Sequence, residues 1–178
     1  MKVSRDKWTK AIHNLINRRA NWGHADDNRK LDNPVRDYAT HMKRCGFGNS
    51  VLDVGCGSQH LKTCLPNDVE YIGMDAFPVD GTDTIRMAVE DMEGIEVDTV
   101  VAFAVLDNCM DFFQTCDRMK AAARQNVMIL TGMNIEVDQY HTFNLQREHF
   151  KLAFHDWHCS VEHQIIPKVW LLNFQRLV

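Results

Sequence analysis

The stretch VLDVGCGSQH, residues 51–60, decides the fold class of this chain. It begins as a short buried strand and continues into a glycine-rich turn, in which Gly55 and Gly57 are separated by one residue. Glycines immediately after a strand permit a sharp turn and let a ligand approach the backbone closely. Gln59 follows where a third glycine might be expected. Because a G-x-G turn alone is a weak signal, the rest of the chain must indicate what this turn holds.

Hydrophobic periodicity predicts a helix at the N-terminus and then an alternation of strands and helices. Trp8, Ile12, Leu15 and Ile16 form one stripe of an amphipathic helix over residues 5–20. Five strands are predicted at 50–54, 69–75, 82–87, 97–106 and 126–133. Helices are predicted at 34–46, 59–65, 110–125 and 144–154, the last capped by Thr142 or Asn144. Residues 156–164 and 168–178 alternate polar and apolar positions and predict a closing antiparallel hairpin.

This order of elements predicts an α/β fold with a mostly parallel, doubly wound sheet between two layers of helices. No repeat or Pro/Gly/Ser-rich linker divides the chain, so we expect residues 1–178 to form one domain. Within it, residues 1–49 would be a helical cap or lid and residues 50–178 the core. In such sheets the ligand lies beyond the carboxyl ends of the strands, where the winding reverses. The turn after residue 54 is at that position.

Composition narrows the class of protein. The chain has 178 residues, 45% hydrophobic and 25% charged, which is typical of a globular protein with a core. No run of eighteen apolar residues predicts a membrane span, and the N-terminus has no signal-peptide pattern, so we expect a cytoplasmic location. Residues 1–49 carry eleven Lys and Arg against five Asp, whereas residues 50–178 carry nine against nineteen Asp and Glu. The basic segment could serve an anionic substrate or pair with the acidic body.

Three aspartates indicate the kind of ligand. Asp53 ends the first strand, where a carboxylate suits an ammonium group better than a pyrophosphate. Asp75 ends the second strand, where an acid can accept both ribose hydroxyls of an adenosine. Asp91 follows the third strand, where an acid beside a free N–H could read an adenine edge. A ligand with an ammonium group and an adenosine but no pyrophosphate is S-adenosylmethionine.

At this point the sequence resembles a known family. VLDVGCGS, YIGMD and VDTVVAFAVLDN look like the first, second and fourth motifs of the class I S-adenosylmethionine-dependent methyltransferases. The resemblance covers roughly residues 34–178 and is nearest to the small type 11 subgroup, with VLDN where an LEH-like segment is usual. It implies strand order 3-2-1-4-5-7-6 with strand 7 antiparallel. It also implies transfer of a methyl group by direct in-line displacement.

The resemblance implies a role for each matching residue. It assigns the residues of the turn to the methionine end of the cofactor: Asp53, Gly55, Cys56 and Gly57. It assigns the other matching residues to the ribose (Asp75), to the adenine (Asp91 and Met92) and, through the backbone, to the amino group (Phe103). Gln59 departs from the family pattern, and its side chain would either crowd the cofactor or point into solvent.

Residues after strands four and five are the candidates for chemistry. Methyl transfer from a sulfonium depends mostly on positioning, and it needs a base only if the acceptor loses a proton. His141 is the best general-base candidate, because histidine titrates near neutrality, and Asp107 is the second candidate. Trp22, His24 and Tyr140 are candidates for substrate contact.

Several alternatives stay open at this level. The histidines and cysteine of residues 141–163 lack zinc spacing, so no metal is expected. No [DNS]-P-P-[YFW] or Pro-Cys follows strand four, so methylation of a nucleic-acid amino group of that type, or of a pyrimidine carbon through a cysteine, is not expected. Only a short N-terminal segment and the loop after strand five are available to build a substrate pocket, which favours a small-molecule acceptor, although nucleic acid and protein acceptors remain possible. A non-catalytic cofactor-binding or partner-activating module is a second hypothesis. A nicotinamide-dependent oxidoreductase is a third, weakened because the turn lacks the last glycine of G-x-G-x-x-G. The oligomeric state cannot be predicted.

Overall fold

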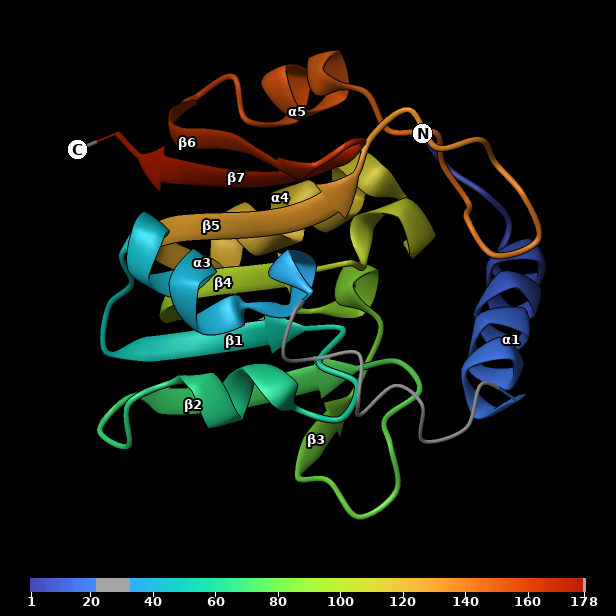
Figure 1. Cartoon of the computed structure of the whole chain (residues 1–178), viewed down its shortest axis with the longest axis horizontal. Coiled ribbons are helices and arrows are strands. Elements are labelled where there is room, and N and C mark those ends of the chain that lie inside the picture. Colours follow the sequence, from blue (N-terminus) through green and yellow to red (C-terminus); the bar gives the residue numbers. More distant parts are fainter. Residues whose placement is uncertain (22–32, 178) are drawn as a thin grey trace.

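The structure is a computed structural model that describes residues 1–21 and 33–177, and it contains a seven-stranded mixed sheet (Figure 1). The strand order is β3-β2-β1-β4-β5-β7-β6. The strands are β1 (Ser50–Val54), β2 (Glu70–Asp75), β3 (Thr84–Arg86), β4 (Val97–Phe103), β5 (Ala123–Gly132), β6 (Trp157–Ile166) and β7 (Val169–Arg176). β7 runs antiparallel to both β5 and β6, and the strands from β3 to β5 are parallel. Both the order and the direction of β7 confirm the prediction.

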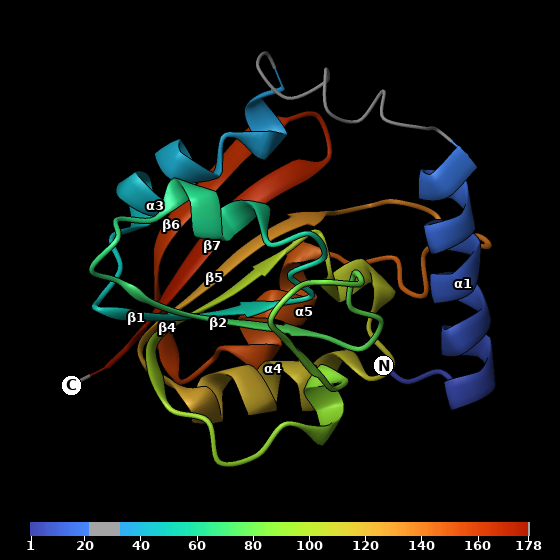
Figure 2. The same cartoon turned by 90° about the horizontal axis from the view of Figure 1, so that it is seen from below.

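Helices cover both faces of the sheet (Figure 2). α3 (Tyr38–Cys45) and the 3-10 helix η2 (His60–Cys64) lie on one face, and α4 (Phe112–Ala122) and α5 (Arg147–Ala153) lie on the other. Consecutive side chains of a strand point to opposite faces. Val51 therefore packs with the α3 side, whereas Leu52 and Val54 pack with the α4 and α5 side. Burial on both faces explains why the central strands are almost wholly apolar.

α1 (Arg5–Asn21), the predicted N-terminal helix, lies beyond the carboxyl ends of the strands rather than on a face of the sheet (Figure 2). The chain before it is tied to the start of α4, since Val3 N–H donates to the Met110 carbonyl at 2.9 Å and Phe112 N–H donates to the Met1 carbonyl at 3.0 Å. No helix in the described part of the chain is long and apolar enough to cross a membrane. α1 is thus placed where the fold puts its ligand.

Element boundaries differ from the prediction in several places. Of the predicted helix at 59–65, only His60–Cys64 are helical, as the short η2, with Gln59 at its N-cap in a left-handed conformation and Leu65 extended. The strand expected from residue 126 already begins at Ala123. α5 begins at Arg147 with Gln146 as its N-cap, so both predicted caps were wrong. The hydroxyl of Thr142 is buried and donates instead to two carbonyls near the end of β4.

The helix predicted at 34–46 is divided into two. A 3-10 turn, η1 (Pro34–Arg36), precedes α3. The Asp37 side chain accepts from Thr40 N–H and caps α3, which ends at Gly46, where φ is 73°. Because this local cap restarts the helix, the apolar spacing alone could not place its first turn.

Candidate functional site

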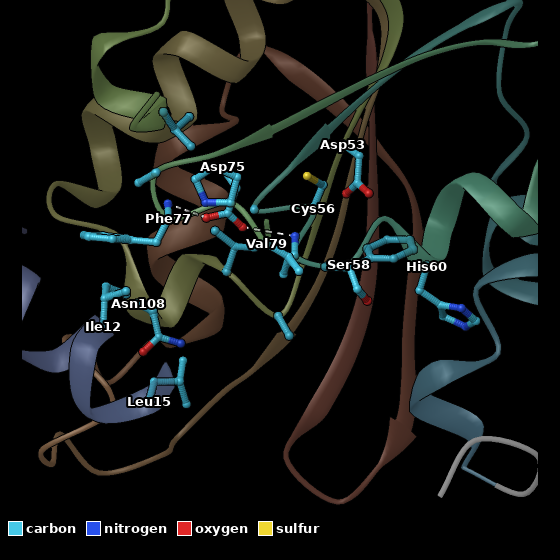
Figure 3. Close-up of a pocket in the computed structure, with 18 of the residues that line it drawn as sticks. Ile12, Leu15, Asp53, Cys56, Ser58, His60, Asp75, Phe77, Val79 and Asn108 are labelled. Atoms are coloured by element: carbon cyan, nitrogen blue, oxygen red, sulfur yellow. Dashed lines mark hydrogen bonds between the residues drawn. The ribbon is translucent and has the colours of Figure 1, made fainter. Parts of the chain in front are cut away.

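A cavity of 1040 Å³ lies beyond the carboxyl ends of β1, β2 and β4 and is closed on one side by α1 (Figure 3). Six of the predicted site residues line it: Asp53, Gly55, Cys56, Gly57, Asp75 and Phe103. Five others do not line it: Asp91, Met92, Asp107, Tyr140 and His141. Trp22 and His24 lie outside the described residues. The structure thus brings together the residues of the glycine turn and the second strand, but not the candidates that follow strands four and five.

The glycine turn has a backbone that other residues adopt with difficulty. Gly55 has φ 68°, and its N–H donates to the Met74 carbonyl at 2.7 Å. A Cβ at Gly55 would run into the side chain of Val105, so this position needs glycine for space as well as for conformation. Gly57 has φ 51°, and no atom lies within 4 Å of the place where its Cβ would be. The turn therefore presents bare backbone to the cavity.

Asp75, at the end of β2, is held by two backbone N–H groups. Gly57 N–H donates to Oδ2 at 3.0 Å, and Phe77 N–H donates to Oδ1 at 2.8 Å (dashed lines in Figure 3). An ionised carboxylate has about four acceptor positions, so each oxygen retains capacity for a further donor. A pre-oriented carboxylate of this kind suits two adjacent hydroxyl groups.

Asp53 is a buried carboxyl group on the opposite side of the turn. It is 4% exposed, and the hydroxyl of Tyr71 donates to its Oδ2 at 2.8 Å. Burial raises the pKa of Asp53 to about 7, the Tyr71 hydrogen bond lowers it, and the nearby Asp75 raises it further. A cation placed beside Asp53 would favour its ionised form and lower this pKa, so the group is suited to an ammonium partner.

Gln59 does neither of the two things expected of it. Its side chain runs sideways from the turn, and Nε2 donates to the Asp83 carbonyl at 2.7 Å and to Thr84 Oγ1 at 2.8 Å. It passes Gly73 of β2, where a Cβ would come within 3.0 Å of Nε2. The left-handed backbone of Gln59, with φ 58°, costs about 1–2 kcal/mol in a non-glycine residue. Two hydrogen bonds of about 0.5–1.5 kcal/mol each offset that cost.

The other end of the cavity is apolar (Figure 3). Phe77 and Val79 follow β2 and line it, and Ile12 and Leu15 come from α1. The Trp8 ring packs against Phe77 with centroids 5.6 Å apart. The apolar stripe of α1 thus faces the cavity, which combines one polar and one apolar end.

Asp91 and Met92 are not placed to touch a ligand in the cavity. Asp91 pairs with Arg5 of α1 at 3.2 Å, and its side chain is 51% exposed. Met92 is 2% exposed within the core. The preceding residues of the 3-10 helix η3 (Val89–Asp91) line the cavity instead, namely Val89 and Glu90. Sequence reasoning missed both residues, because Glu90 and Asp91 are adjacent carboxylates and the pattern does not show which residues of this segment face the cavity.

Glu90 is almost fully buried and serves the fold. Its Oε1 accepts from Met110 N–H at 2.6 Å and from Asp111 N–H at 2.9 Å, just before α4. It therefore satisfies donors at the start of that helix, as expected of an acid near a helix N-terminus.

His141 and Asp107 are close together, with 3.7 Å between Nε2 and Oδ2. The other ring nitrogen of His141, Nδ1, lies 2.9 Å from Asp138 Oδ1, which also accepts from the backbone N–H of Tyr140 at 2.7 Å. Both imidazole nitrogens thus face carboxylates. Asn108, the neighbour of Asp107, lines the cavity in its place.

No group of three His, Cys, Asp or Glu side chains that could hold a metal ion is found among the described residues. The cavity is lined by backbone, carboxylate and apolar groups, and also by polar and basic side chains that include His60, Arg86 and Asn108.

No protein-family model and no curated protein sequence matches the chain. Solved structures match it at low identity. The 1,6-didemethyltoxoflavin-N1-methyltransferase of Burkholderia thailandensis, solved with 1,6-didemethyltoxoflavin and S-adenosylhomocysteine, has a TM-score of 0.63 at 11% identity, over 95% of this chain and 91% of that one.

Two further structures agree with that match. An S-adenosylmethionine-dependent methyltransferase of Aquifex aeolicus has a TM-score of 0.61 at 14% identity, over 85% of this chain and 98% of that one. The magnesium protoporphyrin IX methyltransferase of Synechocystis, with bound S-adenosylhomocysteine, has a TM-score of 0.57 at 11% identity, over 99% and 90%. Together with the strand order, these matches show that the chain has the fold of the class I S-adenosylmethionine-dependent methyltransferases.

Proposed function

We propose that the protein is an S-adenosylmethionine-dependent methyltransferase that acts on a small molecule. One observation carries the proposal: Asp53 and Asp75 lie on either side of the bare glycine turn in one cavity. The buried carboxyl group suits the ammonium of a methionine moiety, and the pre-oriented carboxylate suits the ribose hydroxyls.

The residues present fit this cofactor along its whole length. Asp53 and Gly57 would hold the methionine end, with the backbone of Phe103 for its amino group, and Asp75 would hold the ribose. The apolar end, formed by the loop after β2 and by η3, would hold the adenine. We assign that end to Phe77, Val79 and Val89 rather than to Asp91 and Met92.

When bound, S-adenosylmethionine would supply a sulfonium methyl group for transfer to a nucleophile. The protein would position the cofactor and the acceptor relative to each other and exclude water from around them. The glycine turn and the two aspartates fix the cofactor, and the apolar stripe of α1 keeps water from the cavity. We assign His141 and Asp107 to holding the loop after β5 beside the end of β4, because neither lines the cavity.

The size of the cavity supports a small acceptor. Pockets that hold one drug-sized ligand measure about 300–1000 Å³. The cavity of 1040 Å³ lies at the upper end of this range, which favours a cofactor with a small acceptor over a large one. The Burkholderia thailandensis enzyme of the same fold was solved with both 1,6-didemethyltoxoflavin and S-adenosylhomocysteine bound.

A methyl-transfer assay tests this proposal. Radiolabelled S-adenosylmethionine is incubated with the protein and a panel of small phenols, heterocyclic amines and thiols, with RNA and a protein lysate as further acceptors. We expect label on small molecules, lost in Asp75→Ala. A protein that binds S-adenosylhomocysteine but methylates no acceptor would favour the non-catalytic binding module. That alternative has one observation in its favour, since neither general-base candidate, His141 or Asp107, lines the cavity.

A further inference from the structure

Gln59 has a structural role that cofactor binding alone does not explain. It is 8% exposed and lies beside the cavity without lining it. Glycine would adopt its left-handed backbone more readily. The side chain must therefore supply something that glycine cannot, and it does so through its two hydrogen bonds to Asp83 and Thr84 at the start of β3.

These two bonds begin a series of side-chain hydrogen bonds that leads back to the cavity. Gln59 Nε2 donates to Thr84 Oγ1 at 2.8 Å, and the Thr84 hydroxyl donates to Thr82 Oγ1 at 2.9 Å. The Thr82 hydroxyl then donates to the Val79 carbonyl at 2.6 Å. Each hydroxyl accepts from one neighbour and donates to the next, an arrangement in which the bonds polarise one another. This series of hydrogen bonds ends at the carbonyl of Val79, a residue that lines the cavity and is 49% exposed.

The loop that contains Val79 is the segment that this series of hydrogen bonds holds in place. Residues 76–83 connect β2 to β3, a strand of three residues at the edge of the sheet that pairs with β2. The loop carries Phe77 and Val79, the side chains at the apolar end of the cavity (Figure 3). The hydrogen bonds that begin at Gln59 therefore connect the turn at the polar end of the cavity to the loop at its apolar end.

We propose that Gln59 is a positioning residue that acts through two threonine hydroxyls to hold residues 76–83 against the adenosine end of the cofactor. This inference rests on the proposed function. A glycine in its place would free the turn but would leave the loop without this anchor.

Isosteric variants test this series of hydrogen bonds with little change in shape. Thr82→Val removes the hydroxyl that donates to the Val79 carbonyl and leaves only the longer bond from the Thr82 backbone N–H, at 3.3 Å. Thr82→Ser keeps the hydroxyl and is the matched control. Gln59→Glu keeps the side-chain volume but cannot donate to the Asp83 carbonyl. Each protein is titrated calorimetrically with S-adenosylhomocysteine and with adenosine, and its melting temperature is recorded.

We expect Thr82→Val and Gln59→Glu to lower the affinity for both ligands by a similar factor, about five- to tenfold. The factor is similar because the lost hydrogen bonds support the adenosine end, which both ligands share. Thr82→Ser should bind as the wild type does. The inference is overturned if the affinities stay unchanged while only the melting temperature falls, since that marks a purely structural role. The inference is also overturned if the affinity for S-adenosylhomocysteine falls while the affinity for adenosine does not. Absence of wild-type binding would instead overturn the proposed function, so the two failures are distinguishable.

Discussion

Asp53→Asn should make the protein more stable while removing cofactor binding. The carboxyl group is buried, and its pKa rises from 3.8 to about 7 in the fold. At pH 8 the folded protein must hold an ionised group that it disfavours. Three pKa units at about 1.36 kcal/mol each amount to at most about 4 kcal/mol. Asparagine has nearly the same shape, carries no charge, and can still accept the hydrogen bond of Tyr71.

The stability gained by Asp53→Asn should depend on pH. Between pH 4 and pH 7 the folded wild type binds a proton that the unfolded chain has lost, so its stability rises as the pH falls through 7. The advantage of Asp53→Asn is therefore full above pH 7, about half as large at pH 5.5, and absent below pH 4.

Urea unfolding at pH 8 and pH 5.5 measures this advantage, with the exposed Asp68→Asn as the control. Calorimetric titration with S-adenosylmethionine is run in parallel, and the variant should bind at least tenfold more weakly than the wild type. The reasoning is refuted if Asp53→Asn is no more stable than the wild type at pH 8. It is also refuted if its advantage does not shrink at pH 5.5.

Three further predictions concern the fold around the site. Gly55→Ala should lower the free energy of unfolding by about 2 kcal/mol or more in denaturant titration, because its Cβ would meet Val105 and its φ is 68°. Burial lowers the pKa of His41, so the unfolded chain binds the proton first and the wild type should lose stability as the pH falls below 6.5. His41→Gln should flatten that part of the stability–pH curve. Trp8→Phe removes the indole hydrogen bond to the Asn108 carbonyl at 2.8 Å, and hydrogen exchange of α1 amides should become faster by about fivefold.

Most of the fold could be predicted because local pattern and tertiary packing agree. The strand at 50–54 and the turn at Gly55 and Gly57 are encoded by an apolar run and two glycines that the backbone requires. Asp75 was predictable because its position at a strand end determines what it can reach. These features depend on short stretches of chain, which a single sequence displays.

Features that depend on contacts distant in the chain were not predictable. Asp91 and Glu90 are neighbours with carboxylates, and only packing decides that Glu90 is buried against α4 while Asp91 pairs with Arg5. His141 looked available, but Asp107 and Asp138 meet its two nitrogens from different parts of the chain. The sideways course of Gln59 likewise depends on a partner 24 residues away.

Calorimetric titration of the wild type with S-adenosylhomocysteine tests the central claim most directly, with Asp75→Ala beside it and thermal unfolding to show that both are folded. The account predicts binding at micromolar concentration with one site per chain, lost in Asp75→Ala. A folded wild type that binds neither S-adenosylhomocysteine nor S-adenosylmethionine would contradict it, and tight binding of a nicotinamide dinucleotide in their place would point to the oxidoreductase alternative.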